Sequence, residues 1–600
     1  EVLKIPSYVM VTASHNPKDD NGFKFSFDES GNVKGDDIDK FYDLVISGNF
    51  KEGMGKFSRY NVEKDYLELF RRGINLGDKK LKVVIDLANG TTSCIARELF
   101  EQFDIDLTII NEESDSSFPN HHPDPCVAAN QKQLQDKVLE LHADLGIGFD
   151  GDGDRCGIVD NLGHIIPTDI YMAIMCKDII LNNEDKIYEA LEKDLNKSTV
   201  ETYMCEIGMA LSDIRYQINH LKKWSKRKMV LTSLAQFPSI GYKYYEPYGV
   251  TLVMSTWNYP FLLSVQPTIA SIAAGNTVIL KPSVYAPNTS SLLNKMFTET
   301  CNKNLVTVVE GGRCENEEIL NQKYDYIFFT GSSNVGKIVM SKASEHLTPV
   351  TLELGGKSPC IIDDDDNFKT CVKRCIFGKL LNSGQTCIAT DYLFIREDLK
   401  ERFIEEARII IEDFFGDNPL ASDQMVKIVN KKHFDRLNGL LKDEKILLGG
   451  KIDLKAFKIE PTLVEIKSKD SKLMQEEIFG PILPIMTYKN IDEVIKYIND
   501  HEKPLACYIF SSDKIIQDKI IQKCSFGGGC INGTIMHVLS HNLPFGGVGK
   551  SGMGSYHGKY SFKTFSHEKS ILKKFKSFDF STIYYPYNKL KLKIAKIVIK

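Results

Sequence analysis

Two side chains capable of covalent chemistry lie in glycine-containing segments of the sequence. Cys387 ends the segment LNSGQTC, residues 381–387, and the glycine there lets the backbone approach a substrate closely. Glu353 stands between Leu352 and Leu354, where apolar neighbours raise a carboxyl pKa toward that of a general base at neutral pH. Taken alone, the cysteine also fits an inert core role, and the glutamate an exposed strand end. Together they indicate acyl chemistry through a thioester.

A third polar side chain lies in a charge-free stretch between Glu246 and Lys281. Asn258, within TWNYP at 256–260, can donate a hydrogen bond to an oxyanion in a dry site. Aldehyde oxidation needs such a donor, a thiolate, a base for water and an acceptor for hydride. The stretch is long enough to suggest a membrane helix, but Pro260, Pro267 and Gly275 interrupt it, so we predict buried α/β core.

Five motifs occur in an order that resembles the aldehyde dehydrogenase superfamily. They are WNYP at 257–260, ELGGK at 353–357, GQTC at 384–387, EIFGP at 477–481 and LPFGGVGKSGMG at 543–554. The stretches at 347–359 and 552–558 are most similar to the class 3 and fatty-aldehyde branch. The resemblance extends from about Asn182 to the C-terminus and implies a Rossmann-like coenzyme domain, an α/β catalytic domain and an oligomerisation arm.

The resemblance also implies roles for the three polar side chains. Cys387 would be the nucleophile that forms the thiohemiacetal, and its backbone N–H would share the oxyanion hole with Asn258. Glu353 would activate the water that cleaves the thioester. The substrate would be an aldehyde, and the branch suggests a homodimer.

A glycine-rich turn follows the predicted strand Tyr326–Phe329 and leads into a helix. Free N–H groups and the helix dipole make such a turn suitable for phosphate, although an ordinary strand-to-helix turn is the alternative. By the resemblance, Glu477 would bind the nicotinamide-side ribose and Phe479 would pack near the nicotinamide. The predicted NAD or NADP site consists of Trp257, Lys281, Ser283, Gly331, Ser332, Gly336, Glu477 and Phe479.

One position departs from the family pattern. Many members place a glutamate after the serine of the segment KPS, where it pairs with the ribose hydroxyls, but here Val284 follows Ser283. A carboxylate would repel the 2′-phosphate of NADP, whereas valine does not, and Lys281 could attract it. We therefore expect NADP to be accepted beside NAD.

The first part of the chain carries a different constellation. Ser14 lies in the turn TASHNP at 12–17, and Asp150, Asp152 and Asp154 alternate with glycine, as suits a Mg²⁺ site. An EF-hand is disfavoured because the bidentate glutamate is missing. Residues 1–181 resemble the phosphoglucomutase and phosphomannomutase family, in which Ser14 would be the phosphoserine, assisted by Lys24. The sugar-selecting loop and the phosphate clamp do not follow, so we expect an inactive mutase fragment in a fused or mis-joined product.

These residues must be positioned by an α/β framework throughout. Short apolar runs such as 81–87, 144–149, 249–254 and 277–280 are typical of buried parallel strands, and Asp398–Phe415 is an amphipathic helix that ends before Gly416. We predict mutase-like domains at 1–70 and 71–181, a coenzyme domain at 182–357, a catalytic domain at 358–545 and a C-terminal segment at 546–600, which carries the oligomerisation arm and a basic tail.

Composition limits the other possibilities. Six hundred residues with 42% hydrophobic and 26% charged side chains indicate a multidomain globular protein, and a net charge of −5 gives no attraction to nucleic acid. Fourteen scattered cysteines favour a reducing compartment, so we expect a cytoplasmic protein. The lysine-rich apolar tail at 588–600 leaves weak membrane-surface contact open. The alternatives to an aldehyde oxidoreductase are a phosphohexomutase and a non-catalytic fusion.

Overall fold

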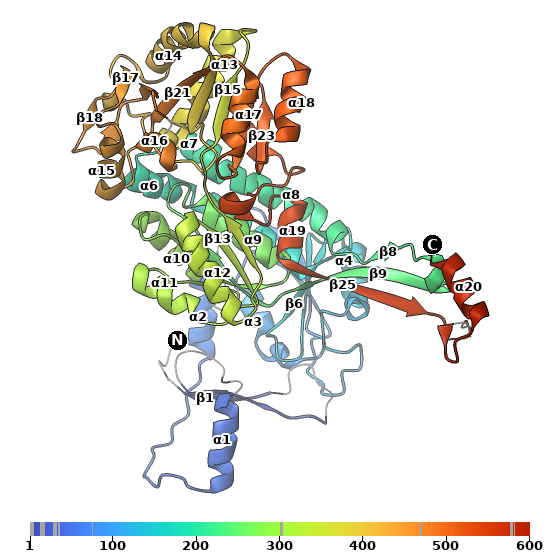
Figure 1. Cartoon of the computed structure of the whole chain (residues 1–600). Coiled ribbons are helices and arrows are strands. Elements are labelled where there is room, and N and C mark those ends of the chain that lie inside the picture. The colour runs from blue at the N-terminus through green and yellow to red at the C-terminus, as the bar shows by residue number, and fades with distance from the viewer. Residues whose placement is uncertain are drawn as a thin grey trace. The chain divides into compact units, whose positions relative to one another are not determined.

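The computed structural model divides the chain into two compact units, Glu1–Tyr171 and Met172–Lys600 (Figure 1). It describes all residues except 1–4, 6, 13–18, 28–32, 34, 35, 75, 301–303, 469, 470, 577–579, 581, 582 and 600. The division falls within helix α5 (Thr168–Asn182), earlier in the chain than the predicted seam near residue 181. The finer domain limits remain predictions.

The first unit is built on a five-stranded sheet in the order β4-β3-β5-β6-β7. β3 pairs in parallel with β4 and β5, and β6 returns antiparallel to β5. Leu134 and Val138 of α4 pack on the sheet beside Val84 and Val159. The bounds are Leu81–Asp86 (β3), Ala96–Phe100 (α3), Ile105–Ile110 (β4), Lys132–Leu141 (α4), Leu145–Phe149 (β5), Cys156–Asp160 (β6) and Ile165–Ile166 (β7).

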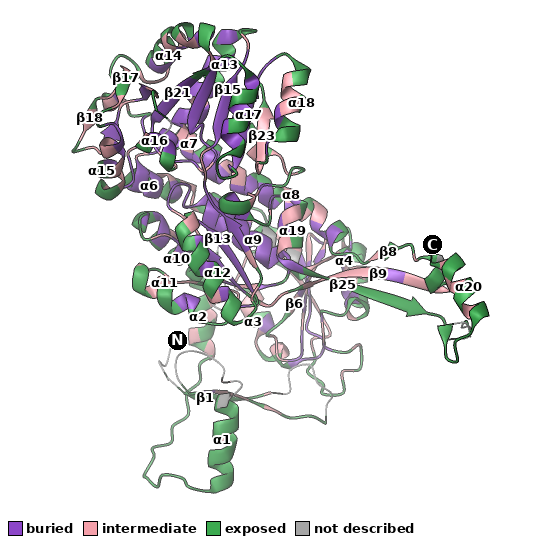
Figure 2. Cartoon of the chain, in the orientation of Figure 1, coloured by how far each residue is buried: buried purple, intermediate pink, exposed green. Residues whose placement is uncertain are grey.

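The segment before this sheet has almost no core. It contains β1 (Tyr8–Val11), β2 (Phe23–Ser26), α1 (Asp36–Ser47) and α2 (Glu63–Gly73). Among its described residues up to Lys80, only Ser26 is buried, and all four residues of β1 are exposed (Figure 2). Apolar side chains such as Val9, Val11 and Phe23 therefore remain at the surface. This exposure agrees with the expected incomplete domain.

The second unit contains a six-stranded sheet in the order β12-β11-β10-β13-β14-β24. Its first five strands are parallel, and β24 joins β14 antiparallel. The predicted strands occur here with ends shifted by a residue or two. The bounds are Val250–Met254 (β10), Thr277–Lys281 (β11), Val306–Val308 (β12), Tyr326–Thr330 (β13), Val350–Glu353 (β14) and Gly552–Met553 (β24), with helices Leu262–Ala273 (α9), Pro287–Thr300 (α10), Arg313–Leu320 (α11) and Ser333–Glu345 (α12).

The charge-free stretch forms β10, α9 and β11, as predicted for α/β core. Every residue of α9 is buried, because the helix packs against its own sheet and against α8 (Gly208–Trp224). In the part of the chain that the structure describes, no helix combines the length and the apolar character needed to cross a bilayer.

A second sheet of seven strands has the order β17-β20-β21-β16-β15-β22-β23, and only β17 runs antiparallel to its neighbour. Its strands β21, β16, β15 and β22 are mostly buried, whereas β17 and β23 are partly exposed (Figure 2). α14 buries Phe403, Ala407, Ile410 and Ile411 as its sequence predicts. The bounds are Pro359–Ile362 (β15), Tyr392–Arg396 (β16), Lys445–Leu448 (β17), Thr462–Glu465 (β20), Ile482–Tyr488 (β21), Ala506–Phe510 (β22) and Gly528–Ile531 (β23), with helices Phe368–Leu380 (α13), Lys400–Phe415 (α14), Lys431–Leu440 (α15), Lys472–Gln475 (α16), Ile491–Asn499 (α17) and Lys514–Lys523 (α18).

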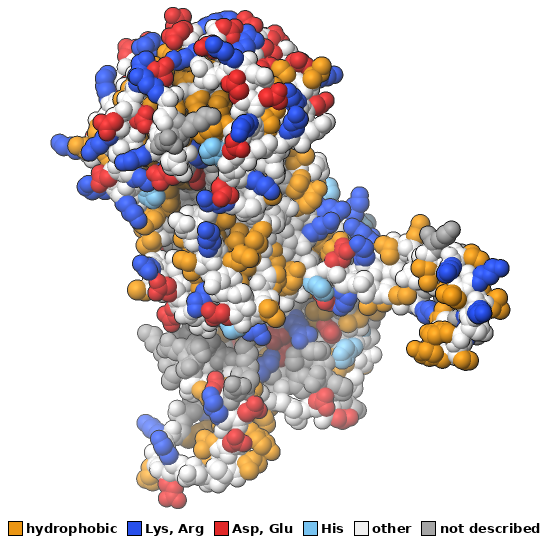
Figure 3. Space-filling view, in the orientation of Figure 1, with side chains coloured by type: hydrophobic (Ala, Val, Ile, Leu, Met, Phe, Trp, Pro, Cys, Tyr) orange, Lys and Arg blue, Asp and Glu red, His pale blue; other side chains and the backbone are white. Residues whose placement is uncertain are grey.

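A three-stranded arm extends away from the six-stranded sheet, and the C-terminus of the chain lies near the far end of this arm (Figure 1). β9 (Ser239–Pro247) pairs antiparallel with β8 (Lys228–Val230) and along the whole of β25 (Ser566–Lys574). The described part of the chain ends in α20 (Lys589–Val598), of which no residue is buried. Lysines and exposed apolar side chains, including Leu590 and Ile597, lie side by side there (Figure 3).

Helix α6 (Glu184–Leu195) fastens the start of the second unit to the six-stranded sheet. Its Asp194 is 5% exposed and accepts four hydrogen bonds from the first turn of α10. The donors are the backbone and side chain of Asn288, at 3.1 and 2.7 Å, and of Thr289, both at 2.8 Å. A carboxylate at a helix N-terminus satisfies free N–H groups and the helix dipole together.

Replacement of Asp194 by alanine should therefore destabilise the second unit. Loss of these charge-assisted bonds should lower the free energy of unfolding by about 2–3 kcal/mol. Urea unfolding followed by tryptophan fluorescence measures the change. Asp398→Ala is the matched control, because that carboxylate is 61% exposed in its pair with Arg396 and its loss should change the free energy of unfolding much less. Equal effects of the two substitutions would contradict the assignment.

Candidate functional site

The three predicted polar side chains come from two sheets of the second unit and meet at one place. Asn258 follows the carboxyl end of β10, and Glu353 is the last residue of β14. Cys387 belongs to the loop between η5 (Leu381–Gly384), which follows α13, and β16 of the second sheet. The site is therefore assembled where the loops of the two sheets face each other.

Cys387 and Glu353 line the same cavity and interact electrostatically. Glu353 is 2% exposed, whereas Cys387 is half-buried. Burial, with a smaller contribution from nearby Glu477, raises the pKa of Glu353 to about 8. Burial and the neighbouring carboxylates also raise the pKa of the Cys387 thiol. Oε1 of Glu353 is buried without a hydrogen-bond partner in the described structure, so it can accept a further proton donor.

Asn258 is fixed beside the nucleophile loop and is 1% exposed. Its amide Nδ2 donates to the backbone oxygen of Gln385, two residues before Cys387, at 3.0 Å. An amide nitrogen has two N–H groups, so one donor capacity is left for another acceptor. The carboxamide thus lies close to the cysteine, as the sequence predicts.

The loop before Cys387 has a backbone that few residues adopt. Asn382 and Ser383 have φ values of +54° and +52°, and Gly384 has φ +74°. A Cβ on Gly384 would lie 2.3 Å from the backbone oxygen of Gly480, so this position requires glycine. Gln385 holds the loop by donating to the backbone oxygens of Asn382 (3.1 Å) and Lys427 (3.0 Å).

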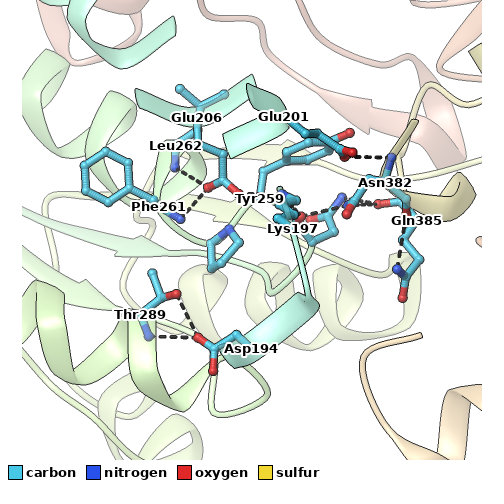
Figure 4. A network of polar contacts seen from close by, with 12 residues as sticks. Asp194, Lys197, Glu201, Glu206, Tyr259, Phe261, Leu262, Thr289, Asn382 and Gln385 are labelled. Atoms are coloured by element: carbon cyan, nitrogen blue, oxygen red, sulfur yellow. Dashed lines mark hydrogen bonds and ion pairs between the residues drawn. The ribbon is translucent and has the colours of Figure 1, made fainter. Parts of the chain in front are cut away.

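A buried polar network, which the sequence analysis did not identify, surrounds this pair of loops (Figure 4). Lys197 and Glu206 form an ion pair of 2.5 Å with both side chains fully buried. Lys197 also donates to the backbone oxygen of Asn258, and Asn382 donates to the same oxygen. The only signal in the sequence is a charged residue in an apolar context, such as Glu206 within YMCEIGMA.

A cavity of about 140 Å³ opens beside Cys387 and Glu353. Its other polar contributors are few, and His557 among them is 3% exposed with a pKa lowered by burial to about 4, so it is neutral at physiological pH. Most of the lining is apolar and consists of Met204, Met209, Leu262, Leu263, Phe377, Leu381, Ile388, Ile535, Met536, Val538, Leu539 and Phe545.

The predicted coenzyme residues lie along one edge of the six-stranded sheet. The carboxyl ends of its parallel strands meet there, and the order β12-β11-β10-β13-β14 reverses direction between β10 and β13. Ligands of open α/β sheets bind at such a reversal. Trp257 follows β10, Lys281 ends β11 and Gly331 follows β13. The fold therefore places these residues at the edge where a dinucleotide would be bound.

The turn after β13 has the features of a phosphate site. Gly331 N donates to the backbone oxygen of Glu353 at 3.0 Å, and Ser332 caps α12 by accepting from Val335 N. A Cβ on Gly336 would lie 2.9 Å from the side chain of Leu354, so glycine allows α12 to approach β14 closely. The start of this 13-residue helix can accommodate an anion.

Lys281 and Ser283 form the loop after β11. Lys281 is 2% exposed and donates to the backbone oxygens of Pro282 (2.9 Å) and Gly311 (2.7 Å), and burial lowers its pKa. Ser283 Oγ accepts from Tyr285 N at 3.3 Å. The next residue, Val284, is 48% exposed. The loop therefore presents an apolar side chain to solvent at the position where many members of the family carry a glutamate.

Glu477 and Phe479 lie on the loop between α16 and β21 of the seven-stranded sheet. A Cβ on Gly355 would lie 2.1 Å from Glu477 Oε2, so the ELGGK glycine makes room for this carboxylate. Burial raises the pKa of Glu477 to about 8. Phe479 meets Trp257 edge to face, with ring centroids 5.4 Å apart.

Lys357, for which the sequence predicted no role, anchors the loop that carries Glu477. Its ammonium pairs with Asp391 at 2.5 Å and donates to the backbone oxygens of Leu473 (2.7 Å) and Glu476 (2.9 Å). Asp391 in turn accepts from Ile478 N at 3.0 Å. The two charges thus link the coenzyme sheet to the loop that carries Glu477.

In the first unit the three predicted aspartates converge. Ligand atoms of Asp150, Asp152 and Asp154 lie within 4.8 Å of one another, and Asp150 Oδ2 is buried without a hydrogen-bond partner in the described structure. Lys24 bonds to Asp152 (3.0 Å) and Asp154 (2.8 Å). The carboxylate oxygens fit a hard cation. Ser14 lies outside the described residues.

Comparison with known families agrees with both resemblances. Residues 173–571 match the aldehyde dehydrogenase family. Residues 1–52 match the phosphoglucomutase/phosphomannomutase alpha/beta/alpha domain I, and residues 64–163 match domain II. The mutase-like fragment and the dehydrogenase fold expected from the sequence are thereby confirmed.

Several proteins are similar to the second unit. The 4,4'-diaponeurosporen-aldehyde dehydrogenase of Staphylococcus aureus is 47% identical over 423 residues, which is 70% of this chain and 92% of that protein. Aldehyde dehydrogenase family 3 member H1 of Arabidopsis thaliana is 43% identical over 70% of this chain and 87% of its own length. The substrate-bound structure of Staphylococcus aureus AldH superposes with a TM-score of 0.70 at 45% identity, covering 72% of this chain and 94% of that one. The chain belongs to the aldehyde dehydrogenase family.

Proposed function

We propose that the protein oxidises an apolar aldehyde to a carboxylic acid with NAD⁺ or NADP⁺, through covalent catalysis by Cys387. One observation carries this proposal. A thiol and a buried carboxyl group interact electrostatically at the wall of one apolar cavity, beside the carboxyl ends of a parallel sheet. Nucleophile and base within hydrogen-bond reach are the arrangement that covalent acyl chemistry requires.

The first stage is attack on the aldehyde. Glu353 accepts the proton of the Cys387 thiol, and the sulfur forms a bond to the carbonyl carbon. The carbonyl oxygen then becomes an alkoxide, which the amide of Asn258 and the backbone N–H of Cys387 stabilise. Such donors typically contribute about 10²–10³ in rate. The product is a thiohemiacetal on Cys387.

The second stage converts this adduct into product. Oxidised nicotinamide, when bound, supplies the acceptor for the hydride that leaves the thiohemiacetal carbon. The resulting thioester is cleaved by water, whose proton Glu353 accepts once it is again ionised. The hydroxide adds to the acyl carbon and the carbon–sulfur bond breaks. The carboxylate product leaves, and Cys387 regains its proton.

Residues of the coenzyme edge would hold the dinucleotide. The N-terminus of α12 with Gly331, Ser332 and Gly336 would face the pyrophosphate, and Lys281 and Ser283 would face the adenosine ribose. Glu477 and Phe479 would face the nicotinamide side, with Trp257 packed against Phe479. Room made by Gly355 for Glu477 and by Gly336 for the close approach of α12 supports this arrangement.

The substrate class follows from the cavity. Its lining is almost entirely apolar, with three methionines that can adapt to a flexible chain. One relative is named 4,4'-diaponeurosporen-aldehyde dehydrogenase. Both observations support medium- or long-chain aldehydes as substrates.

Other properties are proposed on narrower grounds. The exposed edge of β25 supports a dimer formed through the arm, and the described cysteines, none of which is in a disulfide, support a cytoplasmic location. In the first unit, Asp150, Asp152 and Asp154 are a proposed Mg²⁺ site. Phosphohexomutase activity is the second candidate, favoured only by this acidic cluster and its Lys24 contacts.

Purified protein should reduce NAD⁺ or NADP⁺ when given an aliphatic aldehyde, and kcat/KM should rise with chain length. Cys387→Ala should lower the rate by at least about 10⁴-fold, because the covalent route is lost. Cys507→Ala is the matched control, since that thiol is buried in β22 away from the cavity. Interconversion of hexose 1- and 6-phosphates in the presence of Mg²⁺, without aldehyde oxidation, would instead establish phosphohexomutase activity.

The pH profile of turnover should report the Glu353 carboxyl group. Its pKa of about 8 leaves roughly a tenth of the group ionised at pH 7, so kcat should rise from about pH 6 to about pH 9. Glu353→Gln should remove this limb and slow steady turnover by about 10²–10⁴-fold. Stopped-flow measurement of coenzyme reduction separates the first turnover from the steady rate. An unchanged profile in the variant would assign the limb to another group.

Coenzyme selectivity should depend on Val284. The wild-type kcat/KM values for NAD⁺ and NADP⁺ should agree within about tenfold, because no carboxylate faces the 2′-phosphate. Val284→Glu should shift the ratio of the two kcat/KM values toward NAD⁺ by at least about tenfold. Val284→Gln should not, because glutamine has the size of glutamate but carries no charge. A hundredfold wild-type preference for NAD⁺ would contradict the hypothesis.

A further inference from the structure

Two fully buried charges face the loop that carries Asn258. The side chains of Lys197 and Glu206 have no exposed surface, and Nζ and Oε1 are 2.5 Å apart. Removing two charges from water costs several kcal/mol per ion, so a buried ion pair is weak evidence for stabilisation. The contacts that its remaining polar atoms make are therefore the better indication of its role.

Both partners use those atoms on the same short loop, as Figure 4 shows. Lys197 Nζ donates to the backbone oxygen of Asn258 at 3.0 Å and lies 4.2 Å above the ring of Tyr259. Glu206 Oε2 accepts from the backbone N–H groups of Phe261 (2.9 Å) and Leu262 (3.2 Å). The ion pair thus holds the loop at its beginning and at its end, where α9 starts.

The same loop is joined to the loop of the nucleophile. Asn382 Nδ2 donates to the backbone oxygen of Asn258 at 2.8 Å and to that of Gln385 at 3.1 Å. The Asn258 carboxamide donates to that same Gln385 oxygen. The hydroxyls of Tyr259 and Thr386 are 2.7 Å apart. Any displacement of the Asn258 backbone therefore changes the separation of its amide from Cys387.

The local helix geometry aims Glu206 at this loop. Glu206 lies in η3 (Tyr203–Ile207), a π-helical turn inserted between α7 (Thr199–Thr202) and α8. π-turns are rare and recur at functional sites, because the extra residue redirects side chains. From the preceding turn, Glu201 accepts from Asn382 N at 2.9 Å. One short segment, residues 197–206, consequently contacts both the Asn258 loop and the Cys387 loop.

We infer that Lys197 and Glu206 are positioning residues, which fix the Asn258 amide at the oxyanion formed on the substrate. They touch neither substrate nor thiol and act only through the backbone of the Asn258 loop. The inference rests on the proposed oxidation of aldehydes, and it extends the site by an ion pair about sixty residues earlier in the sequence than the donor that it positions.

Lys197→Met, which keeps the length of the side chain and removes its charge, tests the inference in the full-length protein. The first-turnover rate with hexanal and NAD⁺ should fall about 10–100-fold, and KM for the aldehyde should change by less than about threefold. In an Asn258→Ala background, the same substitution should change the rate by less than about twofold, because the group that it positions is gone. Rates are divided by the burst amplitude, which counts active sites, so that a smaller folded fraction does not lower the rate per active site.

Two further variants keep the result decisive. Lys458→Met removes a buried ammonium that donates to the Ser422 backbone at 2.7 Å in the catalytic domain, and it should leave the first-turnover rate unchanged. If Lys197→Met alone does not fold, the charge-neutral Lys197→Met/Glu206→Gln variant replaces it, with the same expected loss.

Full wild-type rate per active site in a folded variant, or equal losses with and without Asn258, would overturn the inference. Inactive wild-type protein would instead contradict the proposed function.

Discussion

The placement of the Cys387 thiol beside the buried Glu353 carboxyl group, at the wall of one cavity, is the constraint on which the rest of the site depends. Burial favours the protonated form of both groups, so the thiol proton must pass to the ionised fraction of Glu353 before the sulfur can attack. A nucleophile from one sheet and a base from another can meet only where the two sheets face each other. The fold of the second unit brings Cys387 and Glu353 together by placing loops of its two sheets face to face.

The polar groups around this contact are held by buried bonds rather than by solvent-exposed ones. The Lys197–Glu206 pair, the Asn382 amide and the Lys357–Asp391 pair each join segments that are distant in sequence. In a medium of low polarity such bonds are strong when complete and costly when broken. A network of this kind keeps the oxyanion donor and the nucleophile at a fixed separation while the apolar cavity remains free to fit different chains.

Much of this site could be predicted because the chemistry leaves local marks. Glycine beside Cys387, leucines around Glu353 and an amide in a charge-free stretch each show in a few neighbouring residues, and the strand ends were placed within a residue or two. Lys197 and Glu206 leave no such mark, because their role depends on contacts with each other and with backbone atoms 55 to 61 residues away. Such long-range pairs of single charges can be recognised only from the three-dimensional structure.

The central claim is that the acyl group is carried by Cys387 and released by Glu353. The most direct test is mass spectrometry of Glu353→Gln after a single addition of hexanal and NAD⁺, followed by peptide mapping. An acyl group is expected on the peptide that contains Cys387; it forms more slowly than in the wild-type protein, because Glu353 no longer accepts the thiol proton, and it persists because water is not activated. An unmodified Cys387 peptide after coenzyme reduction, or an acyl group on another cysteine, would contradict the claim.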